Sequence, residues 1–418
     1  MPRILILIAG HLWSNPRSQK EADALARAGH QVQIGGIWFD QTGADRDLLL
    51  VSGKAWRFEP FLDLRPTTRI GRVKNLLARL RSRLAAESYS KFERSSSALL
   101  GYGAREMLRT AIQTAADLTI VRSEVGMWVA KSLLDRRQRV GVDFEDWYSE
   151  DIQLEARTSR PIRWLKELER RAAADCVYSV TTSRVMADAI AAEYQVPAPH
   201  VVYNVFSLAD HANLDGICAD RRNVNIPSVH WFSQTIGPGR GLELLFAAAE
   251  NITLAFEIHL RGRLSGNYAD WIASIVPPKL RERVFVHDTV PNEELLSHIA
   301  EHDIGLALEE SDVRSRNLTI TNKVFQYMQA GLAIIATDTA GQREIFSQVP
   351  DVGLLIRNND ADALACALIQ LLGNKRRLLD AKRAAIAAFK EKFHWESQSE
   401  AVVRLVNRAI SAPGDYAL

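Results

Sequence analysis

The chain has 418 residues, of which 47% are hydrophobic and 24% are charged. These are the proportions of a globular protein, and the length suggests two or three domains. The 52 lysines and arginines nearly balance the 50 aspartates and glutamates, so the net charge indicates no nucleic-acid partner. Cys176, Cys218 and Cys366 have neither paired nor metal-ligand spacing, which is typical of a reducing compartment.

The first apolar run extends from Ile4 to Ala9. It is too short for a signal peptide, and no small-residue cleavage site follows it. No later stretch approaches the roughly 20 apolar residues that span a bilayer. We therefore expect a soluble, cytoplasmic protein.

Strand-length apolar runs alternate with segments of helical period along most of the chain. The first unit of this pattern is a strand at 4–9, a helix at 19–28 and a strand at 31–34. This βαβ start predicts a parallel sheet. Later strands are expected in two series, at 118–121, 140–144, 176–181 and 201–203, and then at 229–232, 256–261, 284–287, 304–308 and 333–337. Helical segments lie within both series, so we predict two Rossmann-like, doubly wound α/β domains.

The periodicity is lost near residues 205–225, which we expect to join the domains. We place the first domain at 1–210 and the second at 220–394. The segment 395–412 is amphipathic and follows the second domain. We expect it to pack back on the first domain.

Residues 69–94 depart from this pattern. They carry eight basic and two acidic side chains, and six apolar residues from Ile70 to Leu84 have helical spacing. One interpretation is a helix packed on its domain with a solvated basic face. The other is a surface that contacts anionic lipid or a polyanionic acceptor. The sequence leaves both open.

A glycine-rich segment, FSQTIGPGRGLELL, follows the first strand of the second domain and begins a helix. Gly237, Gly239 and Gly241 allow backbone amides to approach a phosphate, and the helix start adds a partial positive charge. Arg240 has a guanidinium suited to phosphate oxygens. The alternative is a tight turn with a solvated arginine.

A second segment, NLTITNKVFQYMQAGLAIIATDTAGQREI, begins at residue 317. It predicts a helix at 323–329 that ends at Gly331, followed by a buried strand. Asn322, Lys323 and Gln326 then lie at a helix start near the carboxyl edge of the sheet, where ligands bind in open α/β folds. A lysine at a helix start is disfavoured unless an anion is near. Core packing accounts for three neighbours, Val324, Phe325 and Met328.

In the first domain, an acidic cluster follows the strand at 140–144. Its members are Asp143, Glu145, Asp146 and Glu150. Carboxylates at such a junction suit acid–base chemistry, and Glu145 and Asp146 are the catalytic candidates. A solvated acidic loop is the alternative. Other polar residues also follow strand ends, namely Gly10, His11, Arg17, Arg122, Ser123 and Glu124.

Two segments contain the letters of a DxD metal motif. Asp45-Arg46-Asp47 is expected in a polar loop, and Asp360 is expected to cap a helix. Neither lies beside the glycine-rich segment, and the ten histidines have no ligand spacing. We therefore expect no essential metal and no separate cofactor.

The segment TNKVFQYMQAGLAIIATDTAGQREI resembles the donor-site region of family-4-type glycosyltransferases, and FSQTIGPGRGLELL is similar to their phosphate-binding loop. Further matching segments are IAGHLWSNPRSQKEADALARAGHQV, ELERRAAADCVYSVTTSRVMADAIAAEY and VVYNVFS. The resemblance spans almost the whole chain, in the expected order. It implies the GT-B fold, which consists of two Rossmann-like domains with an interdomain cleft.

The resemblance also implies roles for particular residues. Arg240 would hold the donor diphosphate beside the glycine amides, Lys323 would lie near the phosphates or the transferred sugar, and Gln326 would face the ribose. Glu145 occupies the position of a catalytic histidine or acid. Many family members have two glutamates eight positions apart, where this chain has Leu318 and Gln326.

By this resemblance, the protein transfers a sugar from a nucleotide-sugar donor to a hydroxyl of a glycan or lipid-linked acceptor, with retention and without a metal. Cell-surface polysaccharide assembly is the expected setting, with peripheral contact at the inner face of the membrane through residues 69–94. The alternatives are a nucleotide-sugar 2-epimerase on the same fold and a nucleotide-sugar-binding protein that has lost turnover. A nicotinamide dehydrogenase is disfavoured, because neither domain begins with GxGxxG.

Overall fold

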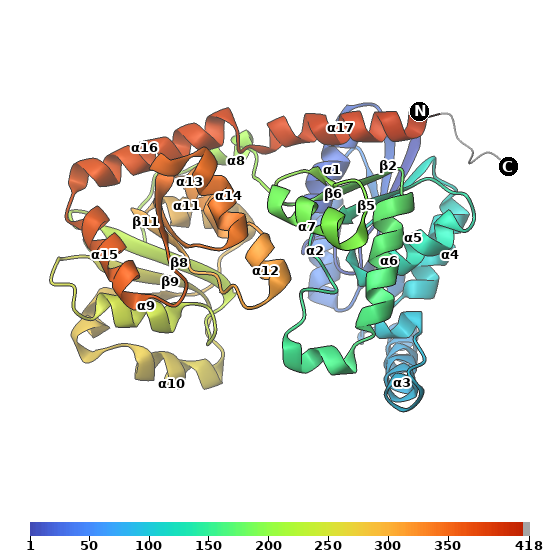
Figure 1. The fold of residues 1–418 in the computed structure, drawn as a ribbon, viewed down its shortest axis with the longest axis horizontal. Helices are drawn as coiled ribbons and strands as arrows, with labels where there is room; N and C mark the ends of the chain where they lie inside the picture. The colour runs from blue at the N-terminus through green and yellow to red at the C-terminus, as the bar shows by residue number, and fades with distance from the viewer. Residues whose placement is uncertain (413–418) are drawn as a thin grey trace. The chain divides into compact units, whose positions relative to one another are not determined.

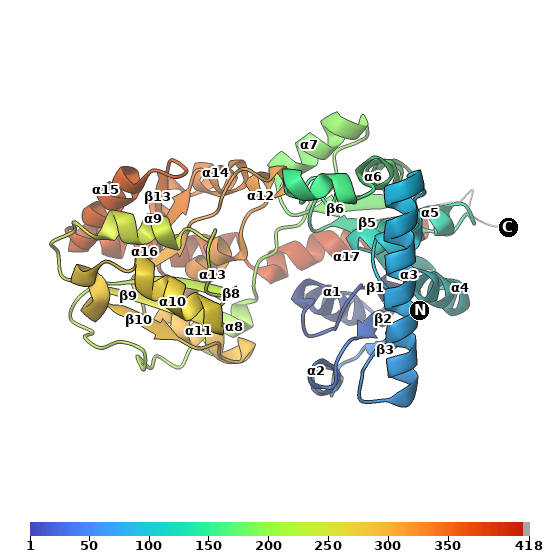
Figure 2. The same cartoon turned by 90° about the horizontal axis from the view of Figure 1, so that it is seen from below.

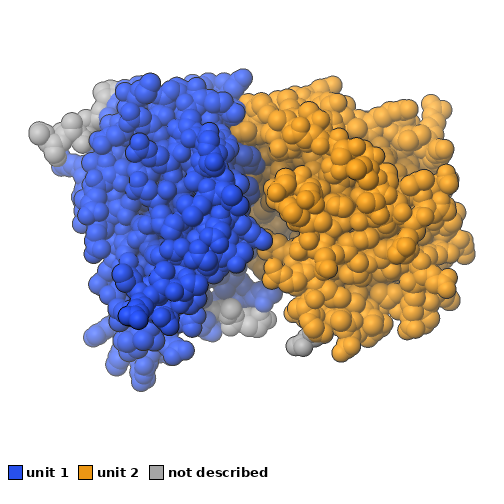
Figure 3. Space-filling model, turned by 180° about the vertical axis from the view of Figure 1, so that it is seen from behind, with its two compact units in different colours: residues 1–202, 398–418 blue, residues 203–397 orange. Residues whose placement is uncertain are grey.

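The computed structural model describes residues 1–412, apart from the side chains of residues 154–156 and 267. The chain forms two compact units (Figure 3). The first contains residues 1–202 together with the chain from Gln398 on, and the second contains residues 203–397. Each unit is built around its own parallel sheet with flanking helices (Figure 1). The predicted pair of Rossmann-like domains is confirmed.

The first unit contains a seven-stranded sheet of order β3-β2-β1-β4-β5-β6-β7. The strand order reverses between β1 and β4, and ligand sites in such sheets lie at the carboxyl ends of strands beside this reversal. Its strands are β1 (Arg3–Leu7), β2 (Gln31–Trp38), β3 (Arg57–Asp63), β4 (Leu118–Val121), β5 (Val140–Phe144), β6 (Tyr178–Thr181) and β7 (His200–Val201). Its helices include α1 (Pro16–Arg27), α2 (Gln41–Val51), α3 (Arg69–Phe92), α4 (Ala104–Thr114), α5 (Ser123–Leu134), α6 (Ile162–Asp175) and α7 (Arg184–Tyr194).

The second unit contains a six-stranded sheet of order β10-β9-β8-β11-β12-β13, with its reversal between β8 and β11. Its strands are β8 (Ser228–Thr235), β9 (Glu257–Arg263), β10 (Val284–His287), β11 (Ile304–Ala307), β12 (Ala333–Thr337) and β13 (Gly353–Ile356). Its helices are α8 (Leu208–Ala212), α9 (Leu242–Ala249), α10 (Gly266–Ile275), α11 (Asn292–Ala300), α12 (Arg314–Leu318), α13 (Asn322–Ala330), α14 (Ala340–Gln348), α15 (Ala361–Leu372) and α16 (Lys375–Glu391).

Local details of the second unit agree with the sequence signals. Gly331 ends α13 with a φ of 76°, in the left-handed region that glycine tolerates. The Asp360 side chain caps α15 by accepting a hydrogen bond from the Ala363 N–H. Val324 and Phe325 are buried in the core, as expected.

One expectation in the first unit is wrong. Residues 45–47 lie in helix α2 and not in a polar loop. Asp47 is fully buried and accepts hydrogen bonds from the Trp13 N–H and the Trp38 indole, at 2.8 and 3.1 Å. It serves as an internal hydrogen-bond acceptor.

The last helix, α17 (Trp395–Ser411), begins in the second unit, and from Gln398 on it belongs to the first. The ring of His30 is hydrogen-bonded to the Asn407 side chain at 2.9 Å, and Arg139 donates to the Ala412 carbonyl at 3.0 Å. The other boundary between the units lies at Val202, just before the 205–225 region in which periodicity fades.

Helix α3 is the long helix of the first unit (Figure 2), and its packed side consists largely of small residues. Gly71 is buried, and an added Cβ would lie 2.2 Å from the Arg65 carbonyl oxygen. Asn75 donates to the Leu64 carbonyl, and Ala78 contacts a small apolar cluster. The larger apolar residues face solvent instead, namely Ile70, Val73, Leu76, Leu77, Leu80 and Leu84.

The exposed fraction of Ile70 is 69%, and that of Leu76 is 68%. Helix α3 therefore packs on its domain with a solvated basic face, as one interpretation expects, but its large apolar residues do not form the packed side. An exposed apolar stripe of this length is unusual on a monomer and indicates an interaction surface. None of the helices formed by the described residues combines the length and apolarity that a membrane-spanning segment needs.

Candidate functional site

The glycine-rich loop connects β8 to α9 at the carboxyl edge of the second sheet. Gly241 has a φ of 79°, and an added Cβ would lie 2.5 Å from the Leu308 Cβ. Gly239 has a φ of 68°. Both the positive φ and the lack of space for a Cβ require glycine at position 241. The loop therefore lies directly against the end of β11. This close approach leaves the amides at the start of α9 at the edge where ligands bind.

Arg240 is exposed at the tip of this loop. Its guanidinium donates to the Ser233 hydroxyl at 2.9 Å, which ties the side chain back to the end of β8. Lys323, at the start of α13, forms an ion pair with Glu309 at 2.6 Å. Its ammonium group lies 5.9 Å from the centre of the Trp231 ring.

Glu309 connects these two cations. Partial burial raises the pKa of its carboxyl group, but the charge and hydrogen bond of Lys323 outweigh this effect, and Arg240 adds to it. The net pKa is lowered, so Glu309 is ionised. Lys323 pairs with Glu309, and the loop that carries Arg240 packs at Gly241 against Leu308, the residue before Glu309, so both predicted cations belong to segments at this edge of the sheet.

Sequence reasoning missed Glu309. The signal was present, because LALEESD continues the strand expected at 304–308, and a carboxylate just past a buried strand lies at the ligand-binding edge. Glu310 follows it. Burial and then the charges of Asp312 and Glu243 raise the pKa of Glu310. The edge therefore contains carboxylates as well as the predicted cations.

Asn322 and Gln326 lie on the same short helix as Lys323. Asn322 is exposed, and its side-chain oxygen accepts a hydrogen bond from Asn204 at 3.1 Å. Gln326 is partly buried one turn after Lys323, and side chains three positions apart share a helix face. Leu318 ends α12, just before this helix.

In the first unit, Asp143 lies inside a buried charge network. Its carboxylate is paired with Arg17 at 2.7 Å and with Arg122 at 3.0 Å, and all three side chains are at most 3% exposed. Arg122 also pairs with Glu21 and donates to the Ser18 hydroxyl at 2.6 Å. Asp143, Arg17 and Arg122 therefore stabilise the carboxyl ends of β4 and β5 from inside.

Glu145 and Asp146 begin the loop after β5, and both are partly exposed. The next residue, Trp147, is fully buried and donates from its indole to the Tyr194 hydroxyl at 2.9 Å. Further along, Glu150 is paired with Lys166 at 2.8 Å. The loop is thus anchored on both sides of the two candidate carboxylates, and of the four acidic residues Glu145 and Asp146 are the more accessible.

A buried glutamate, Glu169, fixes this loop. Its carboxylate accepts hydrogen bonds from the Ser149 N–H at 3.0 Å and from the Tyr194 hydroxyl at 2.7 Å. Burial raises the pKa of Glu169 to about 7, although both hydrogen bonds favour the ionised form. The group therefore titrates near neutral pH while holding the loop that carries Glu145.

The raised pKa predicts a pH-dependent stability. In the unfolded chain the pKa of a glutamate is about 4.3. Between about pH 4.3 and about pH 7 the folded state therefore keeps a proton on Glu169 that the unfolded state has lost. Stability is retained below this window and falls as the pH rises through it. We expect Glu169→Gln to raise the free energy of unfolding by about 1–3 kcal/mol at about pH 8 and to give no gain at about pH 4. Urea unfolding at both pH values measures this. The exposed Glu250→Gln should show no such difference, and an equal response of both variants contradicts the assignment.

Two further strand-end residues of the first unit are held in place. His11 is buried, with Nδ1 3.2 Å from Asp47 and Nε2 accepting the Phe39 N–H at 2.9 Å. Ser123 has a φ of 74°, which is unusual for a residue other than glycine. Its N–H donates to the Tyr148 hydroxyl at 2.8 Å, which links it to the acidic loop. Strained backbone of this kind is often found at functional sites.

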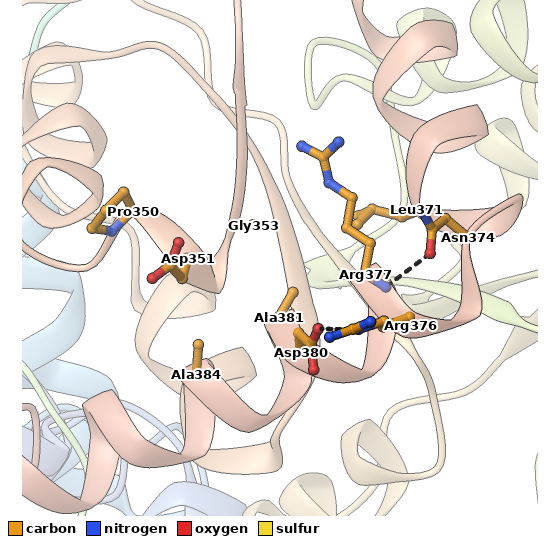
Figure 4. Close-up of a pocket in the computed structure, with 10 residues that line it drawn as sticks. All are labelled: Pro350, Asp351, Gly353, Leu371, Asn374, Arg376, Arg377, Asp380, Ala381 and Ala384. Atoms are coloured by element: carbon orange, nitrogen blue, oxygen red, sulfur yellow. Dashed lines mark hydrogen bonds and ion pairs between the residues drawn. The ribbon is translucent and has the colours of Figure 1, made fainter.

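A hollow of about 470 Å³ lies elsewhere on the second unit (Figure 4). It is lined by the residues before and at the start of β13 and by the first turns of α16, including Asp351, Gly353 and Arg377. The amino ends of the strands border it, so it lies at the edge opposite the glycine-rich loop. None of the predicted site residues lines it.

The comparisons with known proteins agree with this architecture. Residues 228–374 match the model of the family Glycosyl transferases group 1. The fold is similar to sucrose-phosphate synthase from Thermosynechococcus elongatus, with a TM-score of 0.70, 16% identity, and coverage of 99% of this chain and 100% of that chain. It is also similar to HepE of Anabaena in complex with UDP and glucose, with a TM-score of 0.68, 14% identity, and coverage of 97% and 100%.

A weaker similarity is to a protein from Listeria monocytogenes described as a UDP-N-acetylglucosamine 2-epimerase, with a TM-score of 0.54, 10% identity, and coverage of 100% and 99%. No match was found among the curated proteins. The chain thus has the GT-B fold of these structures, and residues 228–374 match the glycosyl transferases group 1 model. The group 1 glycosyltransferase domain is the part of the second unit that carries the glycine-rich loop and Lys323.

Proposed function

We propose that this glycosyltransferase uses a nucleotide-sugar donor held by the second unit, and that it transfers the sugar with retention and without a metal. The observation that carries the proposal is the position of two cations at the carboxyl edge of the sheet: Lys323 pairs with Glu309 at 2.6 Å, and the loop that carries Arg240 packs against the preceding residue, Leu308. A donor diphosphate carries the same kind of charge as Glu309. It would take over the contacts of Lys323 that Glu309 now makes.

The chemistry follows from that charge arrangement. As the bond between the sugar and the diphosphate breaks, the diphosphate keeps the electron pair and gains negative charge. Arg240, Lys323 and the amides at the starts of α9 and α13 stabilise this charge in place of a divalent ion. The acceptor hydroxyl bonds to the sugar carbon, and its proton leaves to a base, for which Glu145 and Asp146 are the candidates. Gln326 binds the ribose through its amide.

The similar structures support this choice of donor class. HepE of Anabaena was solved with UDP and glucose, and a further structure of it contains UDP-glucose. At 14% identity this shows a shared fold, so the base and the sugar are a proposal for this chain. We propose a uridine or related nucleoside diphosphate sugar, with a glycan or lipid-linked acceptor in polysaccharide assembly.

A thermal-shift panel of nucleoside diphosphates and nucleotide sugars tests the donor proposal. A ligand that binds only the folded state raises the melting temperature by mass action. We expect a clear shift with at least one compound, and we expect Arg240→Ala to reduce it. The control is Arg376→Ala, an exposed arginine at the hollow on the opposite edge. Equal shifts for Arg240→Ala and the parent would remove Arg240 from the site.

The same compounds separate the transferase from its alternatives. An epimerase converts the nucleotide sugar when no acceptor is present, and chromatography of the incubated donor detects this. A binding protein without turnover gives a thermal shift but releases no nucleoside diphosphate with any acceptor. A transferase releases the nucleoside diphosphate only when the acceptor is added.

We further propose that α3 binds the surface of an anionic membrane, where a lipid-linked acceptor would be found. The exposed apolar stripe is bordered by six basic residues, namely Arg69, Arg72, Lys74, Arg79, Arg81 and Arg83. A helix with such a stripe and flanking cations suits the interface between lipid headgroups and acyl chains. The small residues on the packed face hold the helix on the first unit and leave the stripe available.

Vesicle sedimentation tests this surface. We expect the protein to bind vesicles that contain phosphatidylglycerol, to bind neutral vesicles weakly, and to lose binding as salt is raised. Replacing Leu76 and Leu80 with serine should weaken binding by about 10-fold or more, because less apolar area enters the membrane. The matched control replaces two exposed apolar residues of the second unit, Ile369 and Leu379, with serine. Equal binding by the α3 variant and the parent, or binding to a soluble polyanion alone, contradicts the membrane proposal.

A further inference from the structure

Three potential metal ligands converge beside the edge strand β10 of the second unit, and His287 lies next to one of them. Asp220 lies in the segment between α8 and β8, His287 is the last residue of β10, and His298 and Glu301 lie one turn apart at the end of α11. Asp220, His298 and Glu301 each place one ligand atom within 4.8 Å of the other two. Three separate parts of the chain thus meet at one point.

His298 lies between two carboxylates. Its Nδ1 is 3.1 Å from Asp220 Oδ2 and 2.9 Å from Glu301 Oε1. One ring nitrogen carries either one hydrogen or one lone pair, so it cannot make a full hydrogen bond to both oxygens. Ligand atoms at about 2.0–2.1 Å from a tetrahedral zinc ion are roughly 3.3 Å apart. The two observed separations are close to that spacing.

A chain of hydrogen bonds fixes the state of His287. His259 Nε2 lies 3.1 Å from a carboxylate oxygen of Glu257, which can only accept, so Nε2 carries the hydrogen. His259 Nδ1 is then the acceptor in its 2.9 Å contact with His287 Nε2, which must donate. His287 Nδ1 is left with a lone pair that faces Asp220 Oδ1 at 3.4 Å. Two acceptors at this separation repel each other unless a proton or a metal ion lies between them.

The local charge also leaves room for a cation. Arg261 pairs with Asp220 and balances one of the two carboxylates. Glu301 accepts a hydrogen bond from the Asp220 N–H at 2.7 Å. This hydrogen bond orients the Glu301 carboxylate but does not neutralise its charge. One negative charge and two imidazoles therefore remain. Mixed nitrogen and oxygen ligands suit Zn²⁺ better than Ca²⁺ or Mg²⁺, which take oxygen ligands.

We propose that Asp220, His298 and Glu301 bind one Zn²⁺ ion, with His287 as the fourth ligand. The contacts of Glu257 with His259, and of His259 with His287, are the outer hydrogen bonds that typically orient a metal-binding histidine. The ion stabilises the fold by fixing the segment before β8 to β10 and α11. None of these residues belongs to the proposed donor site, so the inference does not depend on the proposed function.

Titration of the chelator-treated full chain with Zn²⁺ alone, followed by calorimetry, tests the site. We expect one ion per chain and a higher melting temperature in its presence. Titration with Co²⁺ should produce the visible absorption of a four-coordinate ion. His298→Ala should weaken Zn²⁺ binding by at least about 10-fold, since it removes a direct ligand. The exposed His200→Ala is the matched control and should bind as the parent does.

The Co²⁺ spectrum of the parent chain makes the test independent of how well the variants fold. A parent chain with no such spectrum and no stoichiometric Zn²⁺ binding overturns the proposal, and a proton shared within the cluster would then account for the contacts. Equal binding by His298→Ala, His200→Ala and the parent also overturns it, because the ion would then lie elsewhere.

Discussion

Lys323→Ala is expected to lower the rate of sugar transfer by roughly 100- to 1,000-fold, the typical cost of removing one preorganised charge from the transition state. The ammonium group of Lys323 is partly buried and lies 2.6 Å from Glu309, so it is already positioned at the edge where the donor phosphates are proposed to bind. Its loss removes a positive charge at the point where the leaving diphosphate gains a negative one. We expect the effect mainly on kcat, because that charge develops as the bond breaks.

Steady-state kinetics with the donor found in the thermal-shift panel measures this effect. Glu309→Gln is the informative partner variant, because it frees Lys323 while leaving the cation in place. It should bind a nucleoside diphosphate at least as tightly as the parent. The exposed Lys375→Ala, at the start of α16, is the matched control. A Lys323→Ala enzyme with parental kcat would show that the leaving group is stabilised elsewhere.

Asp143→Ala is expected to cost the first unit about 3–5 kcal/mol of unfolding free energy, which is typical when one member of a buried ion pair is removed. Asp143 is the common partner of Arg17 and Arg122, which are both buried. Without it, two guanidinium groups share the single carboxylate of Glu21. Charges that have been removed from water and lack partners account for most of the cost.

Denaturant unfolding followed by tryptophan fluorescence reports mainly on this unit, since six of the nine tryptophans of the chain lie in it, among them the buried Trp147. Asp188→Ala, an exposed carboxylate on α7, is the control and should change stability by less than about 0.5 kcal/mol. Replacing Asp143 with leucine and Arg17 with methionine together should recover part of the loss, because paired charges can be exchanged for apolar contacts. If Asp143→Ala behaves like the control, the network contributes little.

Strands that form uninterrupted apolar runs could be predicted from the sequence, whether they are buried or, like β10, partly exposed at the edge of a sheet. The expected strands at 118–121, 140–144, 284–287 and 333–337 coincide with β4, β5, β10 and β12. Two strands were missed. β3 contains Pro60 and forms the edge of its sheet, where burial is partial. β13 has only four residues, and three of them are partly buried, so neither strand stands out as an apolar run.

The glycine-rich loop could be located because it follows the clear apolar run of β8. The start of α13 could be located because the helix precedes the clear apolar run of β12. The ion pair between Lys323 and Glu309 could not be found in this way, since it depends on how the start of α13 lies against the end of β11. The direction in which α3 faces was also beyond the sequence. Its pattern is that of an ordinary amphipathic helix, and only the structure shows that Gly71 and Ala78 pack inward while the leucines face outward.

The first unit is discontinuous, because its last helix is encoded after the whole of the second unit. The hydrogen bond between His30 and Asn407 joins residues 377 positions apart. During synthesis, the ribosome therefore completes the entire second unit before the final piece of the first is available. We expect the nascent first unit to wait with an uncovered patch beside α1, where a chaperone could bind, and to complete its folding only after α17 has been synthesised.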